Sequence, residues 1–241
     1  MTTVSVVIPA RNECENIVGL VRLIDAAMQS HWPFEIIIVD DGSSDDTGER
    51  VRAMALSHVR LLRHPKSAGQ SAAIHSGVLA ARAPLICTLD GDGQNPPSEL
   101  PRLIAPLFAD TLGRIGLVAG QRVKRQDTWS KKLASRLANG LRSWILKDGT
   151  RDTGCGLKAF RRDAFLTLPY FDHMHRYLPA LFGRDGWQVV HVDVTHRPRV
   201  AGASNYSNLQ RALVGVVDLL GVAWLLRRAK KALPAPEEPN V

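Results

Sequence analysis

The chain has 241 residues, of which 45% are hydrophobic and 22% are charged. This composition excludes collagen-like, low-complexity and wholly disordered proteins, and the length is enough for a sizeable core. The formal net charge of +8 predicts attraction to a polyanion, such as a nucleic acid, an anionic membrane or a phosphorylated substrate. Three cysteines without a close pair favour a reducing compartment over a disulfide framework.

The N-terminal part of the chain alternates between short apolar runs and stretches with helical periodicity. Strands are predicted at Val4–Ile8, Ile36–Val39, Val59–Leu62 and Leu85–Leu89, and helices at Ile17–Ile24, Thr47–Leu56 and Ala68–Ala81. Alternation of this kind predicts an α/β domain with a mostly parallel sheet and helices on both faces. No signal peptide or bilayer-spanning run is apparent, so we expect a cytoplasmic location, free or peripheral on the cytosolic face of the membrane.

After a further predicted strand at Gly116–Gly120, the sequence becomes basic. Between Arg122 and Arg151 there are nine Lys or Arg residues and two Asp residues. A predicted helix in this stretch carries Leu133, Leu137, Leu141 and Ile145. Strands are predicted at Leu157–Phe160 and Val189–Val194, with helices at Tyr177–Phe182 and Leu209–Lys231, before a tail that is expected to be disordered.

Carboxylates follow three of the predicted strands. Glu13 comes after the first strand, Asp40 and Asp41 after the second, and Asp90 and Asp92 after the fourth. In open α/β sheets, ligands bind at the carboxyl ends of the strands. We therefore expect these acids to lie together along the edge of the sheet formed by those strand ends, which we call the rim. Alternate residues of Asp90-Gly91-Asp92 can aim two oxygen ligands at one Mg²⁺ or Mn²⁺, and Gln94 can add a carbonyl. A solvated turn is the other interpretation of an isolated Asp-x-Asp.

The residues after the second strand allow two interpretations as well. A carboxylate of Asp40 or Asp41 can accept hydrogen bonds from a base or a ribose. A turn followed by a helix cap at Ser44 or Asp45 accounts for the same stretch. Capping does not explain why two acids stand directly at the end of a strand.

Taken together, these segments resemble the family 2 glycosyltransferases of the GT-A fold. The segments are Val4–Pro9 with Asn12-Glu13, Val39–Ser43 and Asp90–Gln94. Further segments are similar to the branch that transfers sugars to polyprenyl phosphates, which includes the dolichol-phosphate mannose synthases: Gly120-Gln121-Arg122, Asn139, Asp152–Phe160 and His196–Arg199 with Gly202 and Ser204. The resemblance covers about residues 4–206. We therefore expect a catalytic domain at 1–206, an amphipathic helix at 207–231 and a tail at 232–241.

The resemblance implies a role for individual positions. Pro9, Arg11, Glu13 and Asp41 would border the nucleotide with Asp40 beside them, and Asp90, Asp92 and Gln94 would hold a metal ion and the diphosphate. Arg122, Arg136 and Arg199 match basic positions that meet donor or acceptor phosphates. Two positions depart from the pattern: Arg11 stands where relatives often have Tyr, and Asn205 stands where they usually have Lys. Asp152, between Arg151 and a glycine-rich turn, is interpreted either as part of that turn or as a residue that places the acceptor or the sugar.

The implied activity is an inverting, metal-dependent transfer of a hexose from a GDP- or UDP-sugar to a polyprenyl phosphate such as undecaprenyl phosphate, with Asp92, Arg122 and Arg199 as catalytic residues. A cation and arginines stabilise a departing diphosphate. A phosphate acceptor is already anionic, whereas a hydroxyl acceptor needs a base. A hydroxyl acceptor and a non-catalytic nucleotide-sugar-binding protein stay open as alternatives. Nucleic acid is not an expected partner, because only the net charge supports it.

The predicted C-terminal helix has an unusual composition. The run Ala212–Leu226 is apolar apart from Asp218, and basic residues follow it. As a helix the run would be about 22 Å long, which is short of the roughly 30 Å needed to span a bilayer. Its composition suits the interface of an anionic membrane. Packing on the domain or in a homo-oligomer is the alternative.

Overall fold

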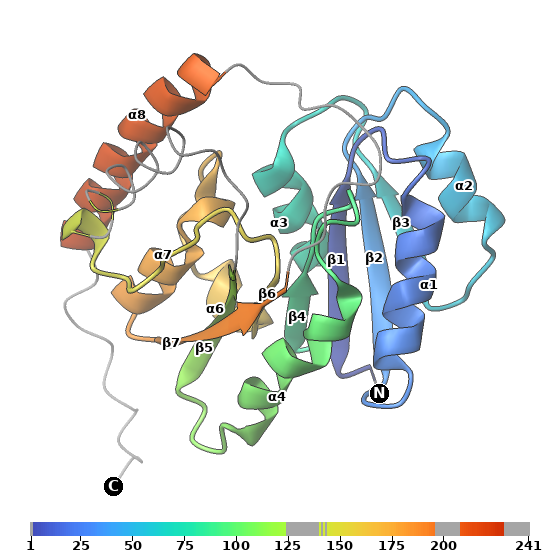
Figure 1. The fold of residues 1–241 in the computed structure, drawn as a ribbon, viewed down its shortest axis with the longest axis horizontal. Helices are drawn as coiled ribbons and strands as arrows, with labels where there is room; N and C mark the ends of the chain where they lie inside the picture. The colour runs from blue at the N-terminus through green and yellow to red at the C-terminus, as the bar shows by residue number, and fades with distance from the viewer. Residues whose placement is uncertain (1, 124–139, 141, 143, 196–207, 229–241) are drawn as a thin grey trace, which may run out of the picture.

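The fold is described from a computed structural model, which covers residues 2–123, 140, 142, 144–195 and 208–228. Its centre is a seven-stranded sheet with helices on both faces (Figure 1). The strands are β1 (Val4–Ala10), β2 (Phe34–Asp40), β3 (Val59–Arg63), β4 (Leu85–Thr88), β5 (Ile115–Arg122), β6 (Lys158–Arg161) and β7 (Gln188–Val194). Their order is β3-β2-β1-β4-β6-β5-β7, and β6 alone runs antiparallel to both of its neighbours. The predicted mostly parallel α/β sheet is confirmed.

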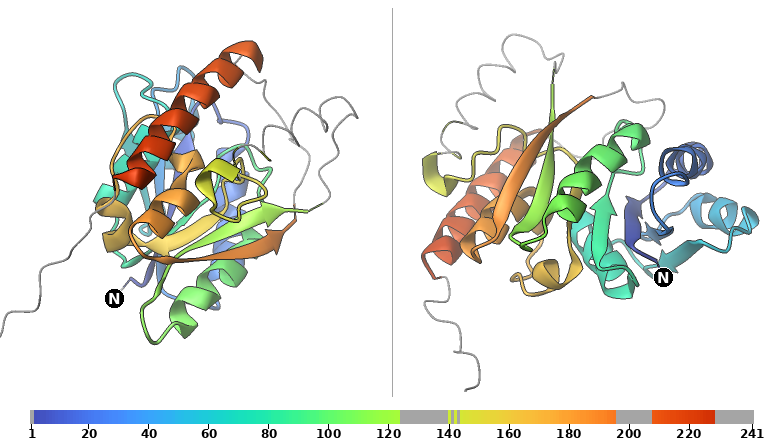
Figure 2. Two further views of the ribbon diagram at one scale, coloured as in Figure 1. Left: turned by 90° about the vertical axis from the view of Figure 1, so that its left-hand side faces the viewer. Right: turned by 90° about the horizontal axis from the view of Figure 1, so that it is seen from below.

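Two hydrophobic cores sandwich the sheet, because successive side chains of a strand point to opposite faces. One core lies under α1 (Ile17–Met28), α2 (Thr47–Ala53) and α4 (Leu100–Ala109) and takes Val6 and Ile8 of β1. The other lies under α3 (Gln70–Ala80), α6 (Arg162–Leu166) and α7 (Leu178–Arg184) and takes Val7. The final helix, α8 (Asn208–Arg227), packs outside α7 (Figure 2). Because both faces of the sheet are buried, the strands have nearly continuous apolar sequences.

The sheet register brings several strand ends to the same edge, at the top of Figure 1. Ala10 of β1 pairs with Asp40 of β2, and Val7 pairs with Thr88 of β4. β4 therefore ends two residues before Asp90. The segments after β1, β2 and β4 must then meet above this edge. These segments contain the acidic residues that were predicted to follow the strands.

Two helices were not predicted, and proline is the reason for the first. α4 has prolines at positions 101 and 106, which in a sequence favour a loop. Pro101 lies in the first turn, where the helix needs no N–H from it. The buried side chains of Leu103, Ile104 and Leu107 hold the helix on the sheet. The second helix, α6, spans only Arg162–Leu166, too short to show a helical period.

Several element ends also differ from prediction. β1 continues through Pro9 to Ala10. α2 ends at Ala53, and Ala55 has a left-handed φ of 50°. α3 begins after Gly69, whose φ of 90° does not fit a helix. Most of the helix predicted between Arg122 and Arg151 and the predicted tail lie outside the described residues, although positions 142 and 144–146 are helical.

Candidate functional site

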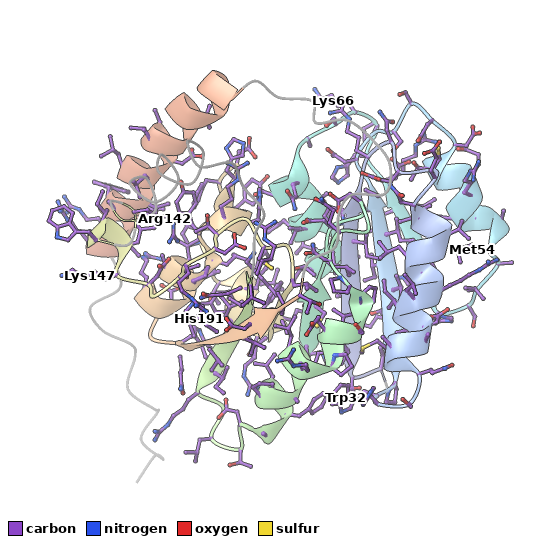
Figure 3. All side chains as sticks on the ribbon, in the orientation of Figure 1. Trp32, Met54, Lys66, Arg142, Lys147 and His191 are labelled. Atoms are coloured by element: carbon purple, nitrogen blue, oxygen red, sulfur yellow. The ribbon has the colours of Figure 1, made fainter. Side chains whose placement is uncertain are left out.

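The segments after β1, β2, β3 and β4 are connected by close backbone contacts at the rim. The N–H of Asp41 donates to the carbonyl of Ala10 at 2.8 Å, and the N–H of His64 donates to the carbonyl of Asp40 at 2.9 Å. A Cβ added to Gly91 would lie 3.1 Å from the carbonyl oxygen of Pro9. The Asp90-Gly91-Asp92 turn thus crosses directly over the end of β1. Lys66 marks the β3 side of the same rim (Figure 3).

The carboxylate of Asp41 is enclosed by hydrogen bonds from the segment after β3. It accepts from Ser67 Oγ at 2.8 Å and from the N–H groups of Ala68 and Gly69 at 2.9 Å each, and His64 Nδ1 lies 2.7 Å away. Burial alone would raise the pKa of Asp41, but these hydrogen bonds outweigh it and lower the pKa. All the ordinary acceptor positions of this carboxylate are occupied. In this arrangement Asp41 fixes the loop at the rim and has no acceptor position left for a base.

Asp40 is also held from within the chain. Its side chain is fully buried, Oδ1 accepts the N–H of Ser43 at 2.8 Å, and Arg63 Nε lies 3.2 Å from Oδ2. Asp40 therefore stabilises the loop after β2, and its place beside a nucleotide stays a prediction. Its buried charge is balanced by an arginine from the edge strand β3.

The loops after β1 and β2 are bound to each other. Asn12 has a φ of 56°, its N–H donates to Ser43 Oγ at 2.9 Å, and its Oδ1 accepts the N–H of Ser44 at 2.9 Å. The N–H of Glu13 donates to Thr47 Oγ1 at 2.9 Å. Pro9 is half-buried and Arg11 is exposed beside these loops. The residues predicted to border a nucleotide thus form one connected surface.

Asp45 anchors this surface and gives it a pH dependence. Thr47 donates to Asp45 Oδ1 from its N–H at 3.0 Å and from its hydroxyl at 2.5 Å, and the N–H of Cys14 donates to Oδ2 at 3.2 Å. Burial opposes the charged form, but the hydrogen bonds outweigh it and lower the pKa of Asp45 to about 2. The predicted cap at Ser44 or Asp45 is wrong: the N-cap of α2 is Asp46, which makes no side-chain cap hydrogen bond, and Asp45 instead binds the N–H of Thr47 at the first helical position.

Replacing Asp45 by Asn is expected to lower the stability of the fold above pH ~4 and to matter less and less as the pH falls towards 2. Because the folded pKa lies below the unfolded value of about 3.9, Asp45 stabilises the fold above that value and loses its contribution as the pH falls through the folded pKa. Urea unfolding of wild type and Asp45→Asn at pH 2, 3, 4 and 6 measures this difference. An equal difference at every pH would contradict the assignment.

The Asp-x-Asp segment lies between the rim and β6. Asp90 Oδ1 accepts from Gln70 Nε2 at 2.7 Å and Oδ2 accepts from Asn95 Nδ2 at 3.0 Å. Asp92 is 9% exposed, and its Oδ1 accepts the N–H of Gln94 at 3.1 Å. Burial raises the pKa of Asp90 and the nearby charge of Asp92 raises it further, while Lys158 opposes the rise. Two carboxylates that repel each other in a confined space form a donor set that favours a cation.

Gly156 provides the space for Asp90. A Cβ added to Gly156 would lie 2.3 Å from Asp90 Oδ2 and 2.5 Å from its carboxyl carbon. The carbonyl of Gly156 accepts from Thr88 Oγ1 at 2.8 Å, which fixes the glycine against β4. The chain must therefore have glycine here for the Asp90 carboxylate to reach its position.

The donor set of this segment fits a hard divalent cation only in part. No group of three or more His, Cys, Asp or Glu side chains able to hold a metal occurs among the residues that the structure describes. Mg²⁺ is usually bound by one or two carboxylates, with waters and substrate phosphates completing the shell. Asp90 and Asp92 therefore fit a cation that shares its ligands with a phosphorylated substrate.

Arg122 is fixed in place by Asp152. The Nε and one terminal nitrogen of Arg122 donate to the two Asp152 oxygens at 2.5 and 2.8 Å. Burial would raise the pKa of Asp152, but the paired Arg122 lowers it overall, and the hydrogen bond to Asp152 raises the pKa of Arg122. The N–H of Gly154 donates to Asp152 Oδ1 at 3.1 Å. Asp152 thus holds the guanidinium and the glycine-rich turn beside Asp90.

Sequence reasoning missed three residues that line a cavity of about 120 Å³ on the β6 side of Asp90. They are Lys158, His175 and Arg176. Lys158 is 6% exposed and donates to the carbonyl of Cys155. A lysine among the apolar residues of the predicted strand Leu157–Phe160 was the available signal, because lysine is almost never fully buried unless it is paired.

Of the predicted site residues, Pro9, Arg11, Glu13, Asp40, Asp41, Asp90, Asp92 and Gln94 gather at the rim, with Arg122 and Asp152 on the β5 side. Glu13 additionally accepts from Asn16 Nδ2 at 2.8 Å. The remaining three, Arg136, Arg199 and Asn205, lie outside the described residues. Cys155 is 1% exposed in the core, and burial raises the pKa of its thiol. These observations favour a packing role for Cys155.

Comparison with known proteins gives three results. The model of a family described as "Glycosyl transferase family 2" matches residues 5–168. An undecaprenyl-phosphate 4-deoxy-4-formamido-L-arabinose transferase from Sodalis glossinidius (strain morsitans) is 35% identical over 208 residues, covering 85% of this chain and 63% of the relative. A protein of the same name from Serratia proteamaculans (strain 568) is 36% identical over 223 residues, covering 90% and 66%. The chain therefore spans less than two thirds of the length of these relatives.

Two solved structures share the fold. Glucosyl-3-phosphoglycerate synthase from Mycobacterium tuberculosis, in complex with Mg²⁺ and uridine diphosphate, superposes with a TM-score of 0.70 at 19% identity, covering 96% of this chain and 81% of the other. Mannosyl-3-phosphoglycerate synthase from Rubrobacter xylanophilus has a TM-score of 0.70 at 18% identity, covering 99% and 79%. At these identities the likeness is one of fold.

Proposed function

The chain belongs to glycosyltransferase family 2, and on that premise we propose that it transfers a sugar from a nucleotide-sugar to a polyprenyl phosphate with the help of Mg²⁺ or Mn²⁺. The observation that carries the proposal is the Asp90 and Asp92 pair, which lies over the end of β1 and against Gly156. The relatives, which are named as undecaprenyl-phosphate sugar transferases, support the acceptor. The GT-A fold, shared with a structure that holds uridine diphosphate, supports the donor.

Different residues at the rim are proposed to bind different parts of the donor. Pro9, Arg11 and Glu13 would border the nucleotide, with Asp40 and Asp41 holding the rim in shape. Asp90, Asp92 and Gln94 would hold the cation, which when bound neutralises the charge that develops on the departing diphosphate. Arg122, oriented by Asp152, adds positive charge at the same place. Arg136, Arg199 and Asn205 are the further proposed contacts to phosphate.

The proposed reaction is a single displacement with inversion. An oxygen of the acceptor phosphate forms a bond to the anomeric carbon while the bond from that carbon to the diphosphate oxygen breaks. The electron pair leaves with the diphosphate, and no proton has to be removed from the acceptor. This suits a rim whose carboxylate at Asp41 is saturated with hydrogen bonds and is therefore a poor general base.

The proposal is tested by transfer of labelled sugar from a panel of UDP- and GDP-sugars to undecaprenyl phosphate in detergent. The panel includes hexoses and an amino-arabinose derivative, because the relatives are named for the latter. The expected result is a labelled product that forms only when both the lipid phosphate and a divalent cation are present, and that does not form when EDTA is added. Absence of transfer from every donor would contradict the proposal.

We further propose that α8 lies on an anionic membrane surface. Its inner side packs through Val222, which is 1% exposed, while Tyr177 Oη donates to the carbonyl of Gly215 at 3.3 Å. Its outer side exposes a row of apolar side chains: Val216, Val217, Leu220 and Trp224, which are 57–69% exposed. No helix among the described residues combines the length and apolarity needed to cross a bilayer. A one-sided apolar face suits the interfacial plane.

Positive charge lies beside this face. The guanidinium of Arg228 is 5.9 Å from the centre of the Trp224 ring. The exposed Lys147 lies near the C-terminal half of α8 (Figure 3), and Leu146 packs in the same core cluster as Val222. Arg142, beside it, is buried and paired with Asp148. Cations next to an exposed tryptophan are suited to anionic headgroups. In the proposed division of the chain, α8 is the described part of a membrane-facing element that follows the catalytic domain.

Replacing Leu220 by Glu is expected to weaken binding to vesicles of phosphatidylglycerol and phosphatidylethanolamine by about 10- to 100-fold, because burial of a leucine side chain contributes about 1.5–3 kcal/mol. Cosedimentation with vesicles measures the change. The matched control is Leu112→Glu, since Leu112 is 72% exposed in the loop after α4. Equal binding of both variants, or loss of a dimer in place of vesicle binding, would contradict this docking surface.

A further inference from the structure

The cavity beside Asp90 carries two cations from separate elements. Lys158 comes from β6, and Arg176 comes from the short helix η2 (Met174–Arg176). Gln70, Thr153 and His175 line the same space. The cavity lies on the β6 side of Asp90, whereas Gly91 and the nucleotide rim lie on the β1 side.

Neither cation forms an ion pair within the part of the chain that the structure describes, although the charge of Asp90 acts on Lys158. Lys158 is buried, and its Nζ donates to the neutral carbonyl of Cys155. The half-buried guanidinium of Arg176 has no ion pair or hydrogen bond there either. Arg122 is different, because it is paired with Asp152. Burial lowers the pKa of Lys158, while the nearby charges of Cys155, Asp90 and Asp152 oppose the fall. A bound anion would favour the charged form of Lys158 and would pair with Arg176.

The remaining groups of the cavity leave this positive charge uncompensated. Asp90 is the one carboxylate among the lining residues, and its oxygens accept from Gln70 and Asn95. His175 Nδ1 lies 2.7 Å from Ser71 Oγ. Burial lowers the pKa of His175 well below its usual range, and the charges of Lys158 and Arg176 lower it further, so the ring is neutral. Lys158 and Arg176, from two separate elements, thus face a single carboxylate among the lining residues.

The cavity also has room for a phosphate group. About 10–15 Å³ is enough to hold one water molecule, and this cavity measures about 120 Å³. A diphosphate bound at Asp92 over the end of β1 would leave from one side of the sugar. A nucleophile that displaces it in line must then approach from the opposite side of the sugar. The cavity lies on the side of Asp90 that faces away from the end of β1.

We propose that this cavity binds the phosphate of the acceptor, with Lys158 and Arg176 as the residues that contact it. The inference rests on the proposed function, because it takes the acceptor to be a lipid phosphate. In this proposal the acceptor phosphate contacts one residue on β6 and one on η2. Arg122, which is paired with Asp152, contacts the diphosphate of the donor. Discrimination between a lipid phosphate and the corresponding alcohol then arises from these two charges.

Arg176→Gln and Lys158→Gln are expected to raise the KM for undecaprenyl phosphate by about 10- to 100-fold each, the usual effect of losing a hydrogen bond to a charged group. The KM for the nucleotide-sugar should stay within about twofold. Arg176→Lys should recover most of the affinity, because it restores the charge. Arg22→Gln is the matched control, since Arg22 is exposed on α1, on the opposite face of the sheet.

Direct binding separates this inference from the proposed function. Calorimetry with farnesyl phosphate and with farnesol, without any donor, should show binding of the phosphate alone, weakened in Arg176→Gln and unchanged in Arg22→Gln. If sugar transfer fails with every donor but this pattern holds, the phosphate site stands and the proposed function falls. Three results would overturn the inference. Farnesyl phosphate does not bind, or it binds equally to wild type and Arg176→Gln, or the substitution raises the KM for the donor instead of the KM for the acceptor. If Lys158→Gln does not fold, the half-buried Arg176 carries the test.

Discussion

Gly156→Ala is expected to lower kcat/KM for sugar transfer by at least about 100-fold while leaving the sheet folded. The new Cβ would lie 2.3 Å from Asp90 Oδ2, so the carboxylate must move away from its position beside Asp92. Displacing a catalytic group by about 1 Å can cost 100-fold in rate. The measurement is steady-state transfer to undecaprenyl phosphate, together with a thermal melt of each protein.

Gly19→Ala is the matched control for this prediction. Gly19 lies on the exposed side of α1 with nothing within 4 Å of an added Cβ. Alanine at this position should stabilise the helix slightly, by about 0.5–1 kcal/mol, and leave transfer unchanged. Full activity of Gly156→Ala would show that the position of Asp90 does not matter for the reaction.

Asp92→Asn is expected to lower transfer by about 10²- to 10⁴-fold and to weaken the binding of Mn²⁺. The substitution keeps the size of the side chain and removes one of the two charges that would hold the cation, whose electrostatic contribution is several kcal/mol. Calorimetric titration with Mn²⁺ in the presence of the donor nucleotide measures binding, and the transfer assay measures turnover.

The matched control for Asp92 is Asp163→Asn. Asp163 is exposed at the start of α6, and its Oδ1 accepts the N–H of Ala164 at 2.8 Å, which an asparagine oxygen can also do. This variant should bind Mn²⁺ and transfer sugar like the wild type. Unchanged metal binding in Asp92→Asn would remove that residue from the cation site.

The rim was predictable from the sequence because it depends on local order. Strands that end at Ala10, Asp40 and Thr88 in a parallel sheet bring the following residues to one edge, whatever the rest of the chain does. The same argument could not show how Asp41 is used. Its carboxylate is enclosed by Ser67, Ala68 and Gly69, and a contact between segments about 27 residues apart leaves no periodic signal in the sequence.

The cavity could not be predicted for a similar reason. Lys158 and Arg176 meet because β6 runs antiparallel between β4 and β5 and because η2 folds back over α3. Neither placement follows from helix or strand periodicity. The resemblance to a family included Lys158 in a motif without a role, and only the packing around Asp90 shows that this side chain is buried next to a carboxylate.

The most direct test of the central claim compares three acceptors under one donor and one divalent cation: undecaprenyl phosphate, undecaprenol and 3-phosphoglycerate. The account predicts labelled product with undecaprenyl phosphate alone, because transfer to the hydroxyl of undecaprenol or of 3-phosphoglycerate needs a base, and no described residue is assigned that role. Transfer to undecaprenol or 3-phosphoglycerate at a comparable rate would contradict it.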